Sequence, residues 1–206
     1  MLPMNQDIYD AFHKEISTAK SDTETAVVYR LPTTWVRSSE NKIQFMVQKT
    51  TEEYQSISAH FQSSTKSNGK ELIRIELIKN EQWYVKYRAH FQDFATRLKQ
   101  NTERHLYHGC AQTAADAIIK NCFDRDFAGK NGTVYGEGIY FSSNSSYSHK
   151  YVSTNFIGKT TKGNSSMNTA LVEFDSTTDE NYIFLTYHDA QAYGEYLITY
   201  IQLAKK

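Results

Sequence analysis

The order of the helical and strand patterns limits the folds that are open to this 206-residue chain. Apolar residues at helical spacing predict helices at 50–61 and 83–98, with a strand of alternating residues at 71–78 between them. Three predicted strands then follow one another near the end of the chain, at 169–174, 182–188 and 195–203. A doubly wound fold needs strands and helices that alternate along the whole chain. The pattern therefore predicts an α+β fold.

The chain shows no internal repeats and no linker long enough to separate large domains. We expect one domain over residues 31–206, preceded by a helical appendage over 1–30 whose helix covers 5–19. Within the domain, Thr113 is predicted to cap a helix, and the polar segment 157–168 is predicted to be an exposed loop.

Charge and cysteine content exclude several classes of protein. Lysine and arginine number 23, as do aspartate and glutamate, and this balance disfavours a protein that binds nucleic acid through phosphate charge alone. The two cysteines, Cys110 and Cys122, are too few for a disulfide framework and favour a reducing compartment. The first residues lack a signal-peptide pattern, and no apolar run reaches about 18 residues. We expect an intracellular protein, in the cytoplasm or nucleus, without a membrane span.

Common phosphate-binding and metal-binding patterns are absent from the sequence. The glycine-rich run "GKNGTVYGEG" lacks the spacing of a phosphate-binding loop and of a dinucleotide-binding turn. His105 and His108 would point to opposite faces of a strand, so a shared zinc ion is not expected and we predict no metal site. A thiol–imidazole pair of His108 and Cys110 is also disfavoured, because residues two apart on a strand rarely meet in the required geometry.

Three short motifs follow one another between Tyr107 and Tyr151, and they read "YHGC", "YGEGIYFS" and "SYSHKY". They resemble the F/Y-H-G-S/T, Y-G-x-G-x-Y-F-A and S-x-S-x-x-Y motifs of the ADP-ribosyltransferase catalytic domain of the poly(ADP-ribose) polymerase (PARP), or diphtheria-toxin-like, type. Over residues 31–203 the chain looks most like the mono-ADP-ribosylating branch that includes macrodomain-bearing members. The resemblance implies split, mostly antiparallel β-sheets flanked by helices.

The resemblance also implies a role for each matching residue in binding NAD+. His108 is expected to bond the ribose on the adenosine side, and the main chain of Gly109 is expected to bond the nicotinamide carboxamide. The Ser148 hydroxyl would bond the same carboxamide. Tyr151 would stack on the cationic nicotinamide ring, and Tyr140 would line the opposite side.

The third motif position separates members that build poly(ADP-ribose) from those that transfer single units. Polymerising members carry glutamate there, whereas alignment of the terminal strands places Ile183 at this position. Glu180 is not a substitute, because three residues along a strand change the face. Two further departures are Cys110, where the family has Ser or Thr, and Cys122, where it usually has glycine. We expect the thiol of Cys110 to weaken a contact to the nicotinamide ribose.

The resemblance therefore implies an enzyme that uses NAD+ as a substrate, without a metal, and transfers a single ADP-ribose to side chains of an acceptor protein. His108, Tyr140 and Ile183 are the expected catalytic positions, and we expect a monomer. One alternative is a non-catalytic binding module with the same fold. A second is an NAD+-consuming enzyme that modifies nucleic-acid ends, since net neutrality does not exclude recognition of a terminal phosphate.

Overall fold

A computed structural model describes residues 31–32, 35, 42–65, 70–124, 126, 135–151, 154–161, 165–167 and 175–202, with only the main chain described from 151 to 167. All of these residues lie within Leu31–Lys206, one of two compact units of the chain. The predicted appendage at 1–30, its helix at 5–19 and the predicted strand at 169–174 lie outside the described residues and stay predictions.

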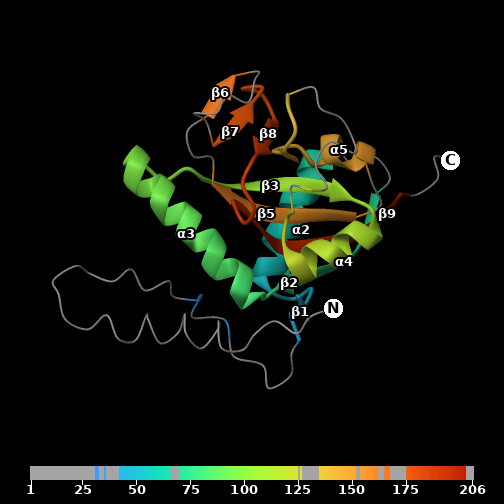
Figure 1. The fold of residues 1–206 in the computed structure, drawn as a ribbon. Coiled ribbons are helices and arrows are strands. Elements are labelled where there is room, and N and C mark those ends of the chain that lie inside the picture. Colours follow the sequence, from blue (N-terminus) through green and yellow to red (C-terminus); the bar gives the residue numbers. More distant parts are fainter. Residues whose placement is uncertain are drawn as a thin grey trace, which may run out of the picture. The chain divides into compact units, whose positions relative to one another are not determined.

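The described strands form one mixed sheet with the order β1-β2-β9-β5-β3-β4-β8-β7-β6 (Figure 1). All neighbouring strands are antiparallel except β6 and β7, which are parallel. In chain order the strands are β1 (Gln44–Met46), β2 (Lys70–Ile78), β3 (Glu103–Cys110), β4 (Ile139–Ser142), β5 (Thr154–Thr161), β6 (Ser165–Met167), β7 (Ser176–Thr178), β8 (Ile183–Thr186) and β9 (Ala192–Gln202).

The sheet is divided into two halves between β3 and β4. These strands share a single pair of opposing residues, Tyr107 and Ser142, whereas β3 pairs with β5 along its whole length. The halves are therefore β1-β2-β9-β5-β3 and β4-β8-β7-β6. The predicted α+β fold with a split, mostly antiparallel sheet is confirmed.

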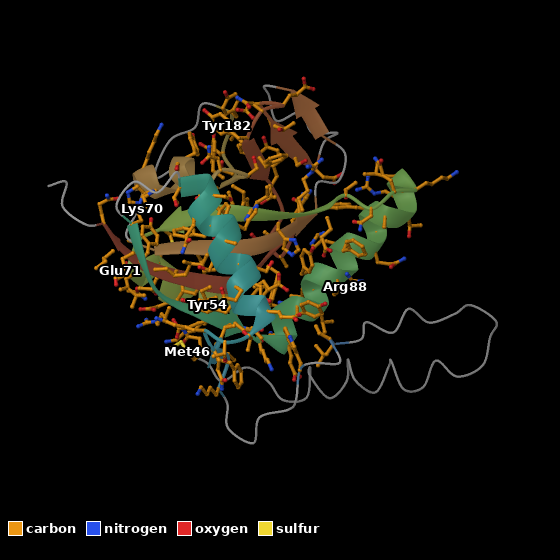
Figure 2. All side chains as sticks on the ribbon, turned by 180° about the vertical axis from the view of Figure 1, so that it is seen from behind. Met46, Tyr54, Lys70, Glu71, Arg88 and Tyr182 are labelled. Carbon is orange, nitrogen blue, oxygen red and sulfur yellow. The ribbon has the colours of Figure 1, made fainter. Side chains whose placement is uncertain are left out.

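Helices cover both faces of the larger half of the sheet. They are α2 (Glu52–Thr65), α3 (Glu81–Leu98), α4 (Gln112–Asn121) and the short α5 (Ser145–Ser148), which continues into a 3₁₀ turn, η2 (His149–Tyr151). Leu106 and Tyr107 are consecutive on β3 and point to opposite faces, so Leu106 packs with Ile119 of α4 and Tyr107 with Phe61 of α2. Figure 2 shows α2, with Tyr54 near its start, lying across the second face.

Local sequence signals explain where the helices begin. Asn80 caps α3, since its side chain accepts a hydrogen bond of 3.4 Å from the main-chain N–H of Trp83. Helix α2 is capped by Thr51, whose Oγ1 accepts from the N–H of Tyr54 at 3.2 Å. The predicted cap at Thr113 is wrong, because α4 starts at Gln112 without a side-chain cap.

The prediction of an exposed loop over 157–168 is also wrong. Most of this segment belongs to β5, which lies inside the sheet between β3 and β9, and to β6. The sequence of β5, "TNFIGKTT", lacks the alternation of apolar residues that marks a strand. Its strand conformation is instead supported by main-chain pairing to neighbours on both sides.

Cys122, at the end of α4, has a main-chain conformation that favours glycine. Its φ is 61° and its ψ is −169°, in a region that residues with a side chain rarely adopt. Its buried thiol donates a hydrogen bond of 3.2 Å to the carbonyl of Ala192, and burial raises the pKa of the thiol to about 12. The thiol therefore stays protonated as a donor, and the backbone geometry explains why glycine would suit this position.

We expect Cys122→Gly to be more stable than Cys122→Ala. Both variants lose the buried thiol, but only glycine relieves the backbone strain, so their free energies of unfolding should differ by about 1 kcal/mol. Urea unfolding of the two variants measures this difference. An alanine variant as stable as the glycine variant would contradict the strain.

Candidate active site

The structure places three of the predicted site residues on neighbouring strands. His108 lies near the end of β3, Tyr140 lies on β4 and Ile183 begins β8. In the β4–β8 ladder Tyr140 opposes Leu185, and Ile183 opposes Ser142. Because opposing residues share a face and residues two apart on a strand do too, Tyr140 and Ile183 lie on the same face of this ladder.

The ring of His108 spans the gap between the two halves of the sheet. Its Nδ1 is 2.8 Å from the main-chain oxygen of Tyr140. A carbonyl oxygen only accepts hydrogen bonds, so Nδ1 carries the hydrogen and the unprotonated Nε2 is the acceptor atom of the ring. The rings of Phe123 and Phe141 lie 5.2 and 5.4 Å from the imidazole, measured between centroids.

Burial lowers the pKa of His108, and the hydrogen bond to the carbonyl of Tyr140 opposes this only in part. The imidazole is therefore uncharged at neutral pH. A neutral ring with a free acceptor nitrogen can bind a hydroxyl group, and it is not suited to bind a carboxylate by charge.

The hydroxyl of Tyr140 organises the turn that precedes β4. It accepts a hydrogen bond of 3.0 Å from the N–H of Tyr135 and donates one of 2.9 Å to the carbonyl of Gly136. The φ of Gly136 is 109°, which requires glycine. At Gly138 an added Cβ would lie 2.8 Å from the carbonyl oxygen of Thr186. Both glycines of the "YGEG" motif are thus explained by backbone geometry.

Ser148 is brought to β3 by the short helix α5. Asn144 caps this helix by accepting a hydrogen bond of 2.8 Å from the N–H of Ser146. The buried Ser148 hydroxyl donates to the main-chain oxygen of Tyr107 at 3.2 Å, two residues before Gly109. The lone pairs of this hydroxyl remain acceptors. The structure therefore brings Ser148 together with the segment that contains His108 and Gly109.

Tyr151 and Ile183 differ in how far the structure describes them. Tyr151 ends η2, and its side chain lies outside the described residues. Ile183 is buried, with 5% of its surface exposed, and its N–H donates to the Asp179 carboxylate at 2.7 Å. Glu180 is exposed in the turn before β8, where its φ is 60°.

The two cysteines are buried in the core. Cys110 is buried in the core beside Leu106 and Ile119, on the face that α4 covers. Within the described ranges, no three side chains of His, Cys, Asp or Glu are grouped in a way that could hold a metal ion. No helix found there is both long and apolar enough to cross a membrane.

The family model of the poly(ADP-ribose) polymerase catalytic domain matches residues 51–161. The chain belongs to this family. Membership confirms the resemblance to the poly(ADP-ribose) polymerase catalytic domain.

Similar curated proteins include three PARP-family members. The human protein mono-ADP-ribosyltransferase PARP14 is 30% identical over 153 residues, which cover 62% of this chain and 8% of PARP14. Mouse protein mono-ADP-ribosyltransferase PARP10 is 27% identical over 153 residues, which cover 62% of this chain and 16% of PARP10. Human protein mono-ADP-ribosyltransferase PARP12 is 29% identical over 124 residues, which cover 50% of this chain and 18% of PARP12. The chain thus spans a small part of each of these relatives.

Sequence analysis missed the contacts that hold these site residues in place. The hydrogen bond from His108 to the main chain of Tyr140 and the one from Ser148 to Tyr107 join segments that are far apart in sequence. Neither hydrogen bond leaves a periodic pattern in the sequence, because each depends on how β3 packs against a remote segment, β4 or α5. Only the motif order indicated that these residues belong together.

We expect His108→Gln to make the stability of this PARP domain less dependent on pH. The pKa of His108 is lower in the folded chain than its ordinary value near 6.5, so the unfolded chain takes up the proton first as the pH falls. The uncharged His108 ring therefore makes its full contribution to stability above pH 6.5, and this contribution is lost as the pH falls below 6.5. Urea unfolding between about pH 7 and pH 5 should show a shallower slope for the variant. An unchanged slope would contradict the lowered pKa.

Proposed function

We propose that the chain is an NAD+-dependent mono-ADP-ribosyltransferase that transfers a single ADP-ribose to side chains of an acceptor protein. The observation that carries this proposal is that His108, Tyr140 and Ile183 lie on three adjacent strands, with the His108 ring bonded to the main chain of Tyr140 and held neutral by burial. Membership of the PARP family and the similarity to mono-ADP-ribosyltransferases support it.

The site residues fit the groups that NAD+ presents. Nε2 of His108 can accept a hydrogen bond from a ribose hydroxyl, because Nδ1 is already held by Tyr140. The lone pairs of the Ser148 hydroxyl suit the N–H groups of the carboxamide, and the main chain of Gly109 lies two residues beyond the carbonyl to which that hydroxyl donates. Tyr140 and Tyr151 would enclose the nicotinamide ring.

In the reaction the bond between nicotinamide and ribose breaks and an acceptor side chain forms a new bond to the same ribose carbon. Nicotinamide leaves with the electron pair of the broken bond and becomes neutral, while positive charge develops on the ribose. The contribution of Gly109, Ser148 and the tyrosines would be to hold the leaving group in one orientation. Such positioning can lower a barrier by several kcal/mol.

Ile183 supports transfer of single units. Its side chain is buried and apolar, and it cannot polarise a ribose hydroxyl to make that hydroxyl the next acceptor. A protein acceptor must then supply its own nucleophile. The buried thiols of Cys110 and Cys122, which form no disulfide, fit the reducing environment of the cytoplasm or nucleus, where we place the protein.

We expect His108→Ala to reduce the release of nicotinamide from NAD+ by about 100-fold, because the ribose loses the acceptor that orients it. His105→Ala is the matched control, since His105 lies on the same strand with 58% of its side chain exposed. It should retain wild-type activity. Wild-type activity in the His108 variant would contradict the assignment, and failure of the wild type to bind NAD+ in calorimetry would favour the non-catalytic module.

A second expectation concerns the product. With Ile183 at the third motif position, radioactive NAD+ should label the acceptor with one ADP-ribose at each modified site. Gel electrophoresis should show sharp bands, and digestion with phosphodiesterase should release AMP without the branched or internal fragments of a polymer. Ladders of product would contradict the placement of Ile183, and label on nucleic acid would favour the second alternative.

A further inference from the structure

Two tyrosine hydroxyls of the sheet are held by side chains of α2. Near the start of the helix, the hydroxyl of Tyr196 on β9 donates to the Glu53 carboxylate at 2.6 Å. Two turns later, the hydroxyl of Tyr107 on β3 is 2.5 Å from Nδ1 of His60. The two contacts are alike in length and join the same helix to different strands, so they can be compared directly.

The contact between His60 and Tyr107 combines a hydrogen bond with ring stacking. The two rings are almost parallel, at 10°, with their centroids 5.6 Å apart. Tyr107 is 1% exposed, and burial raises the pKa of its hydroxyl to about 12, although a hydrogen bond with Ser64 opposes the rise. The hydroxyl therefore keeps its hydrogen and can donate it to Nδ1 of His60. The exposed His60 thus holds a fully buried residue.

Tyr107 is directly connected to several parts of the predicted NAD+ site. Its main-chain oxygen accepts the hydrogen bond of Ser148, and the next two residues along β3 are His108 and Gly109. It also forms the one β3–β4 pair, with Ser142, and Ser142 in turn opposes Ile183. A shift of Tyr107 along or across β3 would therefore move the residues predicted to hold the carboxamide.

The same end of α2 also holds α5, the helix that carries Ser148. The hydroxyls of Ser64 and Ser145 are hydrogen-bonded to each other, and the Ser146 hydroxyl donates to the main-chain oxygen of Ser64 at 2.8 Å. Ser64 lies one helical turn beyond His60. This turn of α2 is therefore joined to both segments, β3 and α5, that meet at Ser148.

We propose that His60 is a positioning residue for the NAD+ site, acting through Tyr107. This inference rests on the proposed function. His60 does not touch the reacting groups: it fixes the side chain of Tyr107, and Tyr107 fixes the spacing between the end of β3 and Ser148. The Glu53–Tyr196 contact has no such connection, because β9 carries none of the predicted site residues.

The test compares variants that lose one or the other contact. His60→Phe keeps an aromatic ring but loses Nδ1, and Tyr107→Phe loses only the hydroxyl. Tyr196→Phe is the matched control. Nicotinamide release from NAD+ and urea unfolding are measured for each variant and for the double variant His60→Phe/Tyr107→Phe.

We expect kcat to fall about tenfold in His60→Phe and in Tyr107→Phe, and the double variant to be no worse than Tyr107→Phe, because both changes break the contact between His60 and Tyr107. His60→Asn should recover part of the rate, since its amide oxygen can accept in place of Nδ1. Tyr196→Phe should keep wild-type kcat although it loses a comparable hydrogen bond, which separates positioning from general stability.

Wild-type kcat in His60→Phe would overturn the inference, as would a loss in Tyr196→Phe equal to that in Tyr107→Phe. Losses that add in the double variant would also overturn it, because the two residues would then act separately. If the wild-type chain neither binds nor cleaves NAD+, the proposed function itself fails and this inference fails with it. If the wild type is active and His60→Phe keeps the wild-type kcat, the positioning role is refuted and the proposed function is not.

Discussion

The arrangement of the candidate site depends on how little β3 and β4 pair. They meet at Tyr107 and Ser142, and the rest of β3 has no opposing residue on β4. In a complete ladder the main chain of His108 would face a strand partner on that side. Because the sheet opens there, the His108 side chain reaches the carbonyl of Tyr140, and Ser148 of α5 reaches the carbonyl of Tyr107.

Three of the predicted site residues carry no charge. His108 has a lowered pKa, Ser148 is a buried hydroxyl and Ile183 is a buried aliphatic side chain. Under the proposed function, such a site would act by orienting NAD+ rather than by general base catalysis. The precision of the surrounding contacts then becomes important, and α2 contributes to it through His60 although that helix carries none of the motif residues.

Features that depend on a few consecutive residues could be predicted. Asn80 caps α3 because its side chain reaches an N–H three residues ahead. The order of the motifs predicts that His108, Tyr140 and Ser148 belong to one site. The structure brings His108 to the main chain of Tyr140 and Ser148 to the main chain of Tyr107, next to His108. The strand β5 could not be predicted in this way. Its residues are largely polar, and its conformation depends on main-chain pairing to two strands that lie far from it in sequence.

By itself, the sequence determined the α+β class, the family through the order of three motifs, and the absence of glutamate at Ile183. Each of these follows from residue identity or local spacing. The tertiary structure alone decided that the sheet opens beside Tyr107, that Nδ1 of His108 carries the hydrogen, and that His60 holds Tyr107 from 47 residues away. These contacts arise where segments remote in the chain pack together, and local periodicity carries no information about which remote side chains will meet.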